Sequence, residues 1–188
     1  EKFQLEIIVS DDGSSDRTVE VSRKVADTVV LNSSSRKGRA SAINRGAAIA
    51  KHENLLFLDA DMIIEKKEAF FKEFEDSFLK DDRIAGGMID FFVYPETETL
   101  TDLITHKFWN LVMRFFILLG WGISTPGFQM GKKPAFTKIG GFNENLRLSQ
   151  DIDYSLRLSK MASFHYFKSA VLLESPRRYR DEGYLIYA

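Results

Sequence analysis

Residues 55–64 read LLFLDADMII, and this stretch decides the fold that we predict. Its apolar start lacks polar alternation, which predicts a strand buried on both faces of a parallel sheet. Asp59 and Asp61 follow, and on a continuing strand their side chains would point to the same side. Ligands of open α/β sheets bind at the carboxyl ends of strands, and carboxylates there are hard ligands for Mg²⁺ or Mn²⁺. A solvated turn at the strand end is the alternative interpretation.

Composition limits the classes of protein that the chain can form. The 188 residues are 44% apolar and include 16 phenylalanines, which predicts one globular α/β domain. The net charge of −1 gives no indication of a nucleic-acid partner, and the absence of cysteine excludes disulfides and thiolate metal sites. No signal peptide is expected at Glu1, and the apolar run 115–123 is too short to span a bilayer.

The turn at residues 11–14, Asp-Asp-Gly-Ser, follows an apolar strand predicted at 6–10. Acidic residues, Gly and Ser after a strand are typical of a tight turn. One interpretation is local capping, with Asp16 capping a helix at 18–26 that places Val21 and Val25 on one face. The other is that an Asp at this strand end binds a nucleotide base or ribose.

A second polar segment precedes a helix of small residues predicted at 40–50, after a short strand at 28–31. Lys37, Gly38 and Arg39 lie where free N–H groups and positive side chains favour a phosphate. A solvated basic loop is the alternative. Asn44 interrupts good helix formers, so we expect it to bond a neighbouring loop.

The second half predicts further elements by periodicity. They are a helix at 66–79 with a Phe stripe in the core, a strand at 84–93 with a bulge or close approach at Gly86-Gly87, a helix at 100–119, a loop at 120–131, a connector at 132–141, a helix at 149–161 capped by Ser149, and a strand at 164–173. Asp151 and Asp153 fall in the first turn of the 149–161 helix, where the helix dipole favours negative charge.

The helix at 100–119 carries more bulky apolar surface than one packing stripe needs. Packing in the core or against a partner is one explanation, and contact with a membrane surface is the other. In the membrane interpretation the aromatic residues enter the interface while nearby cations face anionic head groups; they are Trp109, Phe115, Phe116 and Trp121, with Lys107, Arg114, Lys132 and Lys133. His106 is expected to be an ordinary surface histidine or a satisfied one, and not a metal ligand.

Several of these motifs, in this order and at compatible spacing, resemble family 2 glycosyltransferases of the GT-A fold. They are Asp-Asp-Gly-Ser at 11–14, Lys-Gly at 37–38 with Asn44, Asp-Ala-Asp at 59–61, Gly-Gly-Phe at 140–142 and Gln-Asp at 150–151. The resemblance covers residues 5–173. It implies a Rossmann-like, mostly parallel sheet with helices on both faces, and an inverting, metal-dependent transferase that uses nucleotide-diphosphate sugars.

The resemblance also implies site residues. Asp12, together with Asp11, matches the residue that holds the nucleoside, and Lys37 with Gly38 lines the nucleotide pocket. Asp59 lies beside the ribose and the metal, Asp61 ligates Mn²⁺ or Mg²⁺, and Asp151 matches the catalytic base. The expected donor is a UDP-sugar in preference to a GDP-sugar, and the acceptor is a saccharide or a lipid-linked molecule, with catalysis in the cytoplasm at the inner face of the membrane.

Three departures from the family pattern stand out. The usual first strand, ending in Pro-x-x-Asn-Glu, and its helix are missing before Glu1, so residues 1–188 are expected to be one domain lacking its N-terminal strand. Gln150-Asp151 replaces Glu-Asp, and the Gln-x-x-Arg-Trp signature of processive synthases is not present. Two alternatives remain: a non-catalytic nucleotide-sugar-binding or membrane-associated assembly domain, and a haloacid-dehalogenase-type phosphotransferase with a nucleophilic Asp59.

Overall fold

A computed structural model of the chain describes residues 4–33 and 38–183. The chain divides into two compact units, which are treated separately below. The first takes in the chain up to residue 55 together with 131–154, and the second takes in 56–130 together with the residues from 155 onward.

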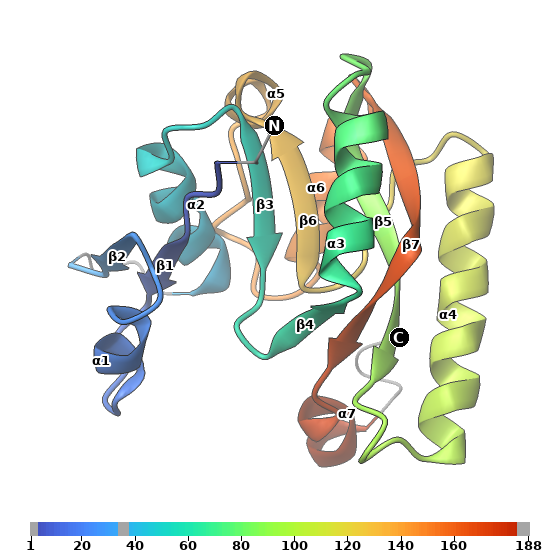
Figure 1. Ribbon diagram of the computed structural model, residues 1–188, viewed down its shortest axis with the longest axis horizontal. Helices are drawn as coiled ribbons and strands as arrows, with labels where there is room; N and C mark the ends of the chain where they lie inside the picture. The colour runs from blue at the N-terminus through green and yellow to red at the C-terminus, as the bar shows by residue number, and fades with distance from the viewer. Residues whose placement is uncertain (1–3, 34–37, 184–188) are drawn as a thin grey trace. The chain divides into compact units, whose positions relative to one another are not determined.

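Strands and helices are interspersed along the chain, as in an α/β protein (Figure 1). In order they are β1 (Ile8–Asp11), α1 (Thr18–Ser22), β2 (Thr28–Leu31), α2 (Arg39–Ile49), β3 (Asn54–Leu58), β4 (Met62–Glu65), α3 (Lys67–Glu73), the π-helix η1 (Phe74–Phe78), β5 (Ile84–Val93), α4 (Leu100–Leu118), β6 (Phe128–Lys132), α5 (Lys133–Lys138), α6 (Gln150–Ser159), β7 (Ser163–Glu174) and α7 (Arg177–Glu182).

In the first unit, β1 and β2 pair in parallel from Ile8 opposite Thr28 to Asp11 opposite Leu31. The small residues of α2 allow it to lie close against β1, because a Cβ added at Gly46 would already be 3.7 Å from the Ser10 Cβ. Elsewhere in this unit Phe142 and Tyr154 stack with ring centroids 4.3 Å apart. Both rings are buried and supply part of this unit's apolar core.

The second unit contains a three-stranded sheet in the order β4-β7-β5, with β5 and β7 parallel and β4 antiparallel to β7. Strands β3 and β6 form a separate two-stranded pair. Helices α3 and α4 pack against the three-stranded sheet, and in Figure 1 they flank β5 and β7. The predicted Phe stripe is confirmed, since Phe70 and Phe78 are fully buried while Phe71 and Phe74 pack against the same core.

The predicted close approach at Gly86-Gly87 is also confirmed. A Cβ at Gly86 would lie 2.4 Å from the ring of Phe164, and one at Gly87 would lie 2.6 Å from the ring of Phe167. The register of β5 against β7 shifts between Ile84 and Gly86, so a bulge accompanies the contact.

Helix α4 has its polar residues on the inside. Asp102, His106 and Asn110 are buried, whereas the outward stripe is apolar and includes Phe108 and Phe115, which are each 56% exposed. The buried groups bond to the sheet and to the helix itself: Asn110 exchanges two hydrogen bonds with the backbone of Phe91, and the His106 ring lies between the Asp102 carbonyl and the Glu174 carboxylate. His106 is therefore satisfied, as predicted, and the helix's surplus of apolar surface faces outward.

Two predictions about local structure are wrong. The strand before the acidic pair ends at Leu58, which is exposed, so β3 is not buried on both faces and Asp59 to Asp61 form a turn. The Met62 N–H donates to the Asp59 carbonyl and closes this turn, because β4 must start afresh to pair with β7. Strand alternation therefore does not orient the two carboxylates.

Other boundaries also differ from the prediction. The loop predicted at 120–131 ends in β6, because Phe128 and Met130 are fully buried, and the connector at 132–141 contains α5. Helix α1 stops at Ser22 because the N–H groups of Lys24 and Val25 bond only three residues back, and both Val21 and Val25 are exposed. Ser149, the predicted cap of α6, has φ 58°, in place of the extended conformation usual at an N-cap.

Candidate functional site

The Asp-Asp-Gly-Ser turn gives its two carboxylates different tasks. Asp11 is 7% exposed, and its carboxylate accepts the N–H groups of Gly13 and Ser14. Hydrogen bonding from Ser14 and Gly13 outweighs the effect of burial and lowers the pKa of Asp11. Gly13 has φ 105°, a left-handed value that favours glycine. Asp11 therefore shapes the turn itself. The predicted helix cap, Asp16, accepts the Thr18 N–H, but the N-cap residue of α1 is Arg17, which makes no side-chain cap.

Asp12 joins three separate segments of the first unit. Its Oδ1 accepts from Asn32 Nδ2 and from Arg45 Nη2, both at 2.8 Å, and its Oδ2 accepts from the Gly38 N–H at 2.5 Å. Burial by itself raises the pKa of Asp12, but these donors outweigh it and the net pKa is lowered. A carboxylate has about four acceptor positions, so Asp12 retains capacity for one more donor, such as a nucleobase N–H.

The start of α2 is arranged differently from the predicted phosphate cradle. Lys37 lies outside the described residues. Gly38 has φ 122°, where a side chain would be strained, and its N–H is directed at the Asp12 carboxylate. This N–H thus orients the Asp12 carboxylate and not a phosphate.

Asp151 is paired with Arg39. Asp151 lies in the first turn of α6, and its Oδ1 is 2.5 Å from Arg39 Nη1, with the two side chains only 19% and 26% exposed. The ion pair orients a half-buried carboxylate from a partner 112 residues away in the chain.

Asn44 bonds a neighbouring loop, as predicted. Its Nδ2 donates to the Phe142 carbonyl and to Glu144 Oε1, and its Oδ1 accepts the Phe142 N–H, all at 2.9 Å. Gly141 is needed here, because it has φ 66° and an added Cβ would lie 2.6 Å from Asn44 Oδ1. Asn44 therefore anchors the Gly-Gly-Phe loop to α2.

The Asp59–Asp61 turn belongs to the second unit. The Asp59 N–H donates to the Gly127 carbonyl at 3.0 Å, and the Asp59 carboxylate lies against Gly127, where an added Cβ would be 3.2 Å from Oδ2. Asp61 is exposed, and the Tyr94 hydroxyl donates to its backbone carbonyl at 2.7 Å. Burial, with the nearby charges of Asp61 and Glu174, raises the pKa of Tyr94, so the hydroxyl stays a donor.

The carboxylates of this turn fit a metal ion whose remaining ligands come from the substrate. Within residues 4–33 and 38–183, no cluster of three His, Cys, Asp or Glu side chains could hold an ion by itself. Two carboxylates remain at Asp59 and Asp61. Mg²⁺ binds in this way, through one or two carboxylates with phosphate oxygens and water in the other positions.

Three contacts escaped prediction from the sequence. They involve Arg45, Asn32 and Arg39 as partners of the predicted carboxylates. An arginine within a helix of small residues was the only local signal for Arg45, and the basic run at 37–39 was the signal for Arg39. The partners themselves could not be read from spacing.

Solved structures with the same architecture define the class. A mannosyltransferase from Pyrobaculum calidifontis, solved with GDP-Man and Mn²⁺, superposes with a TM-score of 0.70 at 20% identity, covering 90% of this chain and 47% of that one. Staphylococcus aureus TarS, residues 1–349 with UDP-GlcNAc, gives 0.62 at 17% identity, covering 90% and 49%. The fold is that of the GT-A glycosyltransferases.

The sequence gives the family within that class. Residues 1–140 match the model of glycosyl transferase family 2, and the chain belongs to this family. Membership decides against the haloacid-dehalogenase-type alternative. No helix in the described part of the chain is long and apolar enough to cross a membrane.

Two curated relatives match most of the chain. The poly-β-1,6-N-acetyl-D-glucosamine synthase of Staphylococcus aureus (strain COL) is 26% identical over 160 residues, which is 81% of this chain and 38% of that protein. A glycosyltransferase of Haemophilus influenzae is 29% identical over 171 residues, covering 87% and 55%. The chain thus spans about four-tenths to just over half the length of these relatives.

Proposed function

We propose that the chain is the catalytic domain of an inverting glycosyltransferase that moves a sugar from a nucleotide-diphosphate donor to an acceptor hydroxyl. The first candidate for the donor is a UDP-sugar. The observation that carries the proposal is the Asp12 carboxylate, oriented by Gly38, Arg45 and Asn32 with one acceptor position to spare. UDP-GlcNAc in the TarS complex supports uridine as the nucleoside. Residues 1–188 act as one transferase domain in this proposal.

Each candidate residue has a role in the reaction. Asp12 receives a nucleoside N–H, while Asp11 holds the turn and Lys37-Gly38 flank the nucleotide. Asp61, with Asp59, would hold Mn²⁺ or Mg²⁺, which when bound offsets the negative charge of the diphosphate. Mn²⁺ in the mannosyltransferase complex supports this assignment.

Asp151 is the base of the proposed reaction. The acceptor oxygen forms a bond to the anomeric carbon, the bond from that carbon to the diphosphate oxygen breaks, and the hydroxyl proton passes to the Asp151 carboxylate. The nucleoside diphosphate leaves with the electron pair of the broken bond. Attack from the face opposite the leaving group inverts the anomeric centre, so no covalent enzyme intermediate forms. The Arg39 contact holds the carboxylate in one orientation for this transfer.

A screen of donors tests the proposal. Melting temperature is measured with UDP-, GDP- and other nucleotide sugars, each with and without Mn²⁺, because a ligand of the native state raises it. Hydrolysis or transfer of the donor that binds is then followed by release of nucleoside diphosphate. A Mn²⁺-dependent shift with turnover is expected. Binding without turnover would favour the non-catalytic alternative, and no shift with any donor would refute the proposal.

The acceptor is proposed to be lipid-linked or membrane-proximal, with the enzyme at the cytoplasmic face of a membrane. The supporting observation is the outward apolar stripe of α4, in which Leu118 is 84% exposed and Phe108 and Phe115 are 56% exposed. Trp109 contributes less than the sequence indicated, because it packs against the core, and Arg114 is paired with Asp90. Exposed Lys107 remains to face anionic head groups.

Vesicle sedimentation tests the membrane contact. Binding to anionic vesicles that weakens with salt is expected, with loss of binding in the double variant Phe108→Asp/Phe115→Asp. Lys67→Asp, at the exposed start of α3, changes the net charge by the same amount and controls for charge alone. Equal binding by both variants, or no binding by the unaltered chain, would refute the membrane contact and leave the transferase proposal standing.

A further inference from the structure

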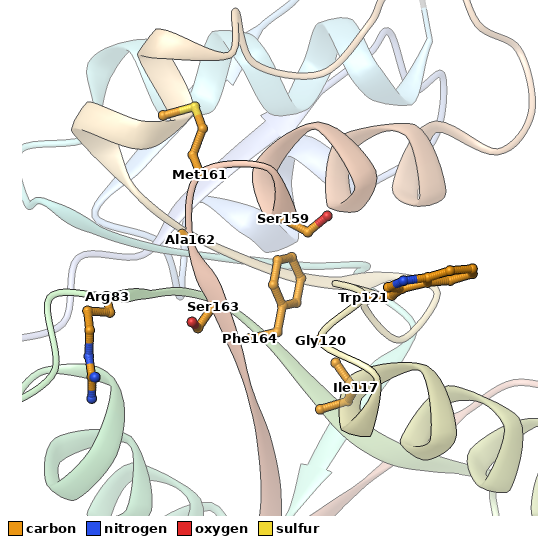
Figure 2. Close-up of a pocket in the computed structure, with 9 residues that line it drawn as sticks. All are labelled: Arg83, Ile117, Gly120, Trp121, Ser159, Met161, Ala162, Ser163 and Phe164. Carbon is orange, nitrogen blue, oxygen red and sulfur yellow. The ribbon is translucent and has the colours of Figure 1, made fainter.

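A hollow of about 640 Å³ opens in the second unit (Figure 2). It is lined by side chains from the end of α4, the end of α6 and the starts of β5 and β7, among them Trp121, Ser159, Ser163 and Phe164. Ser163 pairs with Ile84 at the first position of β5, whereas Tyr94, just past the end of β5, bonds to Asp61. A ten-residue strand is about 33 Å long, so the hollow is a separate site.

Trp121 is held as a flat platform in this hollow. Its indole stacks on Phe116 with centroids 5.4 Å apart and 6° between the planes, yet the residue remains 58% exposed. The backbone N–H of Trp121 donates to the Phe116 carbonyl, which fixes the backbone at this position. Gly122 follows, and an added Cβ there would lie 2.4 Å from both Phe164 and Ser159. Glycine at this position allows the loop to sit against the wall of the hollow.

The charges around the hollow indicate a neutral ligand. Arg83 is the charged residue in the lining, and its Nε and Nη2 already bond to Asp81 at 2.9 and 2.7 Å. The remaining polar groups are neutral: the Ser159 hydroxyl, which donates to the Leu156 carbonyl and can still accept, the Ser163 hydroxyl and the indole N–H. A nucleotide or phosphate would have to compete with the Asp81 carboxylate for Arg83.

An exposed aromatic face beside a few hydroxyl groups matches one ligand chemistry. A pyranose ring presents apolar C–H groups on its faces and hydroxyls around its edge, so one ring of an oligosaccharide can pack on the indole while hydroxyls of the chain bond to serines elsewhere in the lining. We propose that this hollow binds a neutral oligosaccharide through stacking on Trp121. The inference goes beyond the transferase reaction, since the site touches no reacting atom. Its role is to retain a glycan chain, which raises the effective concentration of that chain at the enzyme.

Titration calorimetry with neutral tetrasaccharides tests the site directly. The probes are linear tetramers of glucose, N-acetylglucosamine, mannose and rhamnose, with a sulfated tetrasaccharide as the charged comparison. We expect at least one neutral tetramer to bind, Trp121→Ala to weaken it by at least about tenfold, and Trp121→Phe, which keeps a ring, to lose less. Ser163→Phe, at an exposed strand start, places a bulky ring among the lining residues and should also weaken binding, which tests the site even if Trp121→Ala fails to fold.

Two further measurements separate this proposal from the others. Donor binding and donor hydrolysis should be unchanged in Trp121→Phe and Ser163→Phe. If the unaltered chain neither binds nor hydrolyses a donor, that result refutes the transferase proposal and not the glycan site. Phe115→Asp, on the outward stripe of α4, should leave tetrasaccharide affinity unchanged. Three results would overturn the inference. They are absence of binding by all neutral tetramers, an affinity in Trp121→Ala and Ser163→Phe equal to that of the unaltered chain, and preference for the sulfated probe.

Discussion

Replacement of Asp12 by Asn tests whether the carboxylate organises the first unit. The amide keeps the shape and one acceptor oxygen, but its NH₂ group then faces one of the three donors, from Asn32, Arg45 or Gly38. A hydrogen bond to a charged group contributes about 1.5–3 kcal/mol. Because the Asp12 side chain is 31% exposed, solvent screening favours the lower part, about 2 kcal/mol.

That loss corresponds to a fall in melting temperature of about 4–8 °C for a chain of this length, measured by thermal denaturation at pH 7. Glu20→Gln, on exposed α1, removes a carboxylate bonded to Arg17 and Lys24 and should leave the melting temperature unchanged. Mn²⁺-dependent UDP binding should also weaken in Asp12→Asn, because the amide offers fewer acceptors to the nucleoside.

The contribution of Asp12 to stability should depend on pH. The pKa of Asp12 is lowered in the folded chain, so its contribution is fully present above the unfolded value of about 3.9 and is lost as the pH falls through the folded value. The difference in unfolding free energy between the unaltered chain and Asp12→Asn should therefore be constant from pH 7 to about pH 5 and shrink below it. Equal melting temperatures at pH 7, or a difference that grows on acidification, would refute the reasoning.

Three further predictions concern the second acidic turn, the proposed base and a buried histidine. Asp61→Ala should abolish Mn²⁺-dependent UDP affinity in calorimetry while Glu65→Ala, an exposed carboxylate on β4, retains it; unchanged affinity in Asp61→Ala would contradict the metal assignment. Asp151→Asn should bind donor nearly normally yet lose transfer by about 10²-fold or more, with Asp153→Asn in the same helical turn as control, and near-normal turnover in Asp151→Asn would remove it as the base. Burial opposes the charged form of His106, but Glu174 and the Asp102 carbonyl outweigh this effect and raise the pKa of His106. The histidine therefore stabilises the fold below its unfolded pKa of about 6.5, and this contribution is lost as the pH rises through the folded pKa. Between pH 6 and 9 the melting temperature should fall less steeply in His106→Gln than in the unaltered chain, and parallel curves would disprove the link.

Local patterns were sufficient for much of the fold. β2 and β5 have the predicted bounds, and α2 and α4 agree to within a residue. The reason is that burial of one face imposes a period of two or 3.6 residues that the sequence records directly. The Phe stripe of α3 and η1 and the tight packing at Gly86 and Gly87 follow from the same kind of information.

Patterns were insufficient where two structures share one pattern. An apolar run before Asp59 fits a continuing strand as well as a strand and a turn, and pairing of β4 with β7 decided for the turn. Likewise, the periodicity of α4 showed two faces without showing which one is covered. The fold covers the polar face, because Asp102, His106 and Asn110 find their partners there.

The sequence by itself determined the family and the candidate site residues: carboxylates at 11–12, 59, 61 and 151, near strand ends and a helix start, in the order of family 2 glycosyltransferases. Only the tertiary structure decided what those carboxylates contact. Asp12 meets Arg45 from 33 residues away, and Asp151 meets Arg39 from 112 residues away. Such contacts depend on the path of the whole chain, whereas propensity and periodicity act over a few residues, so no local signal could specify them.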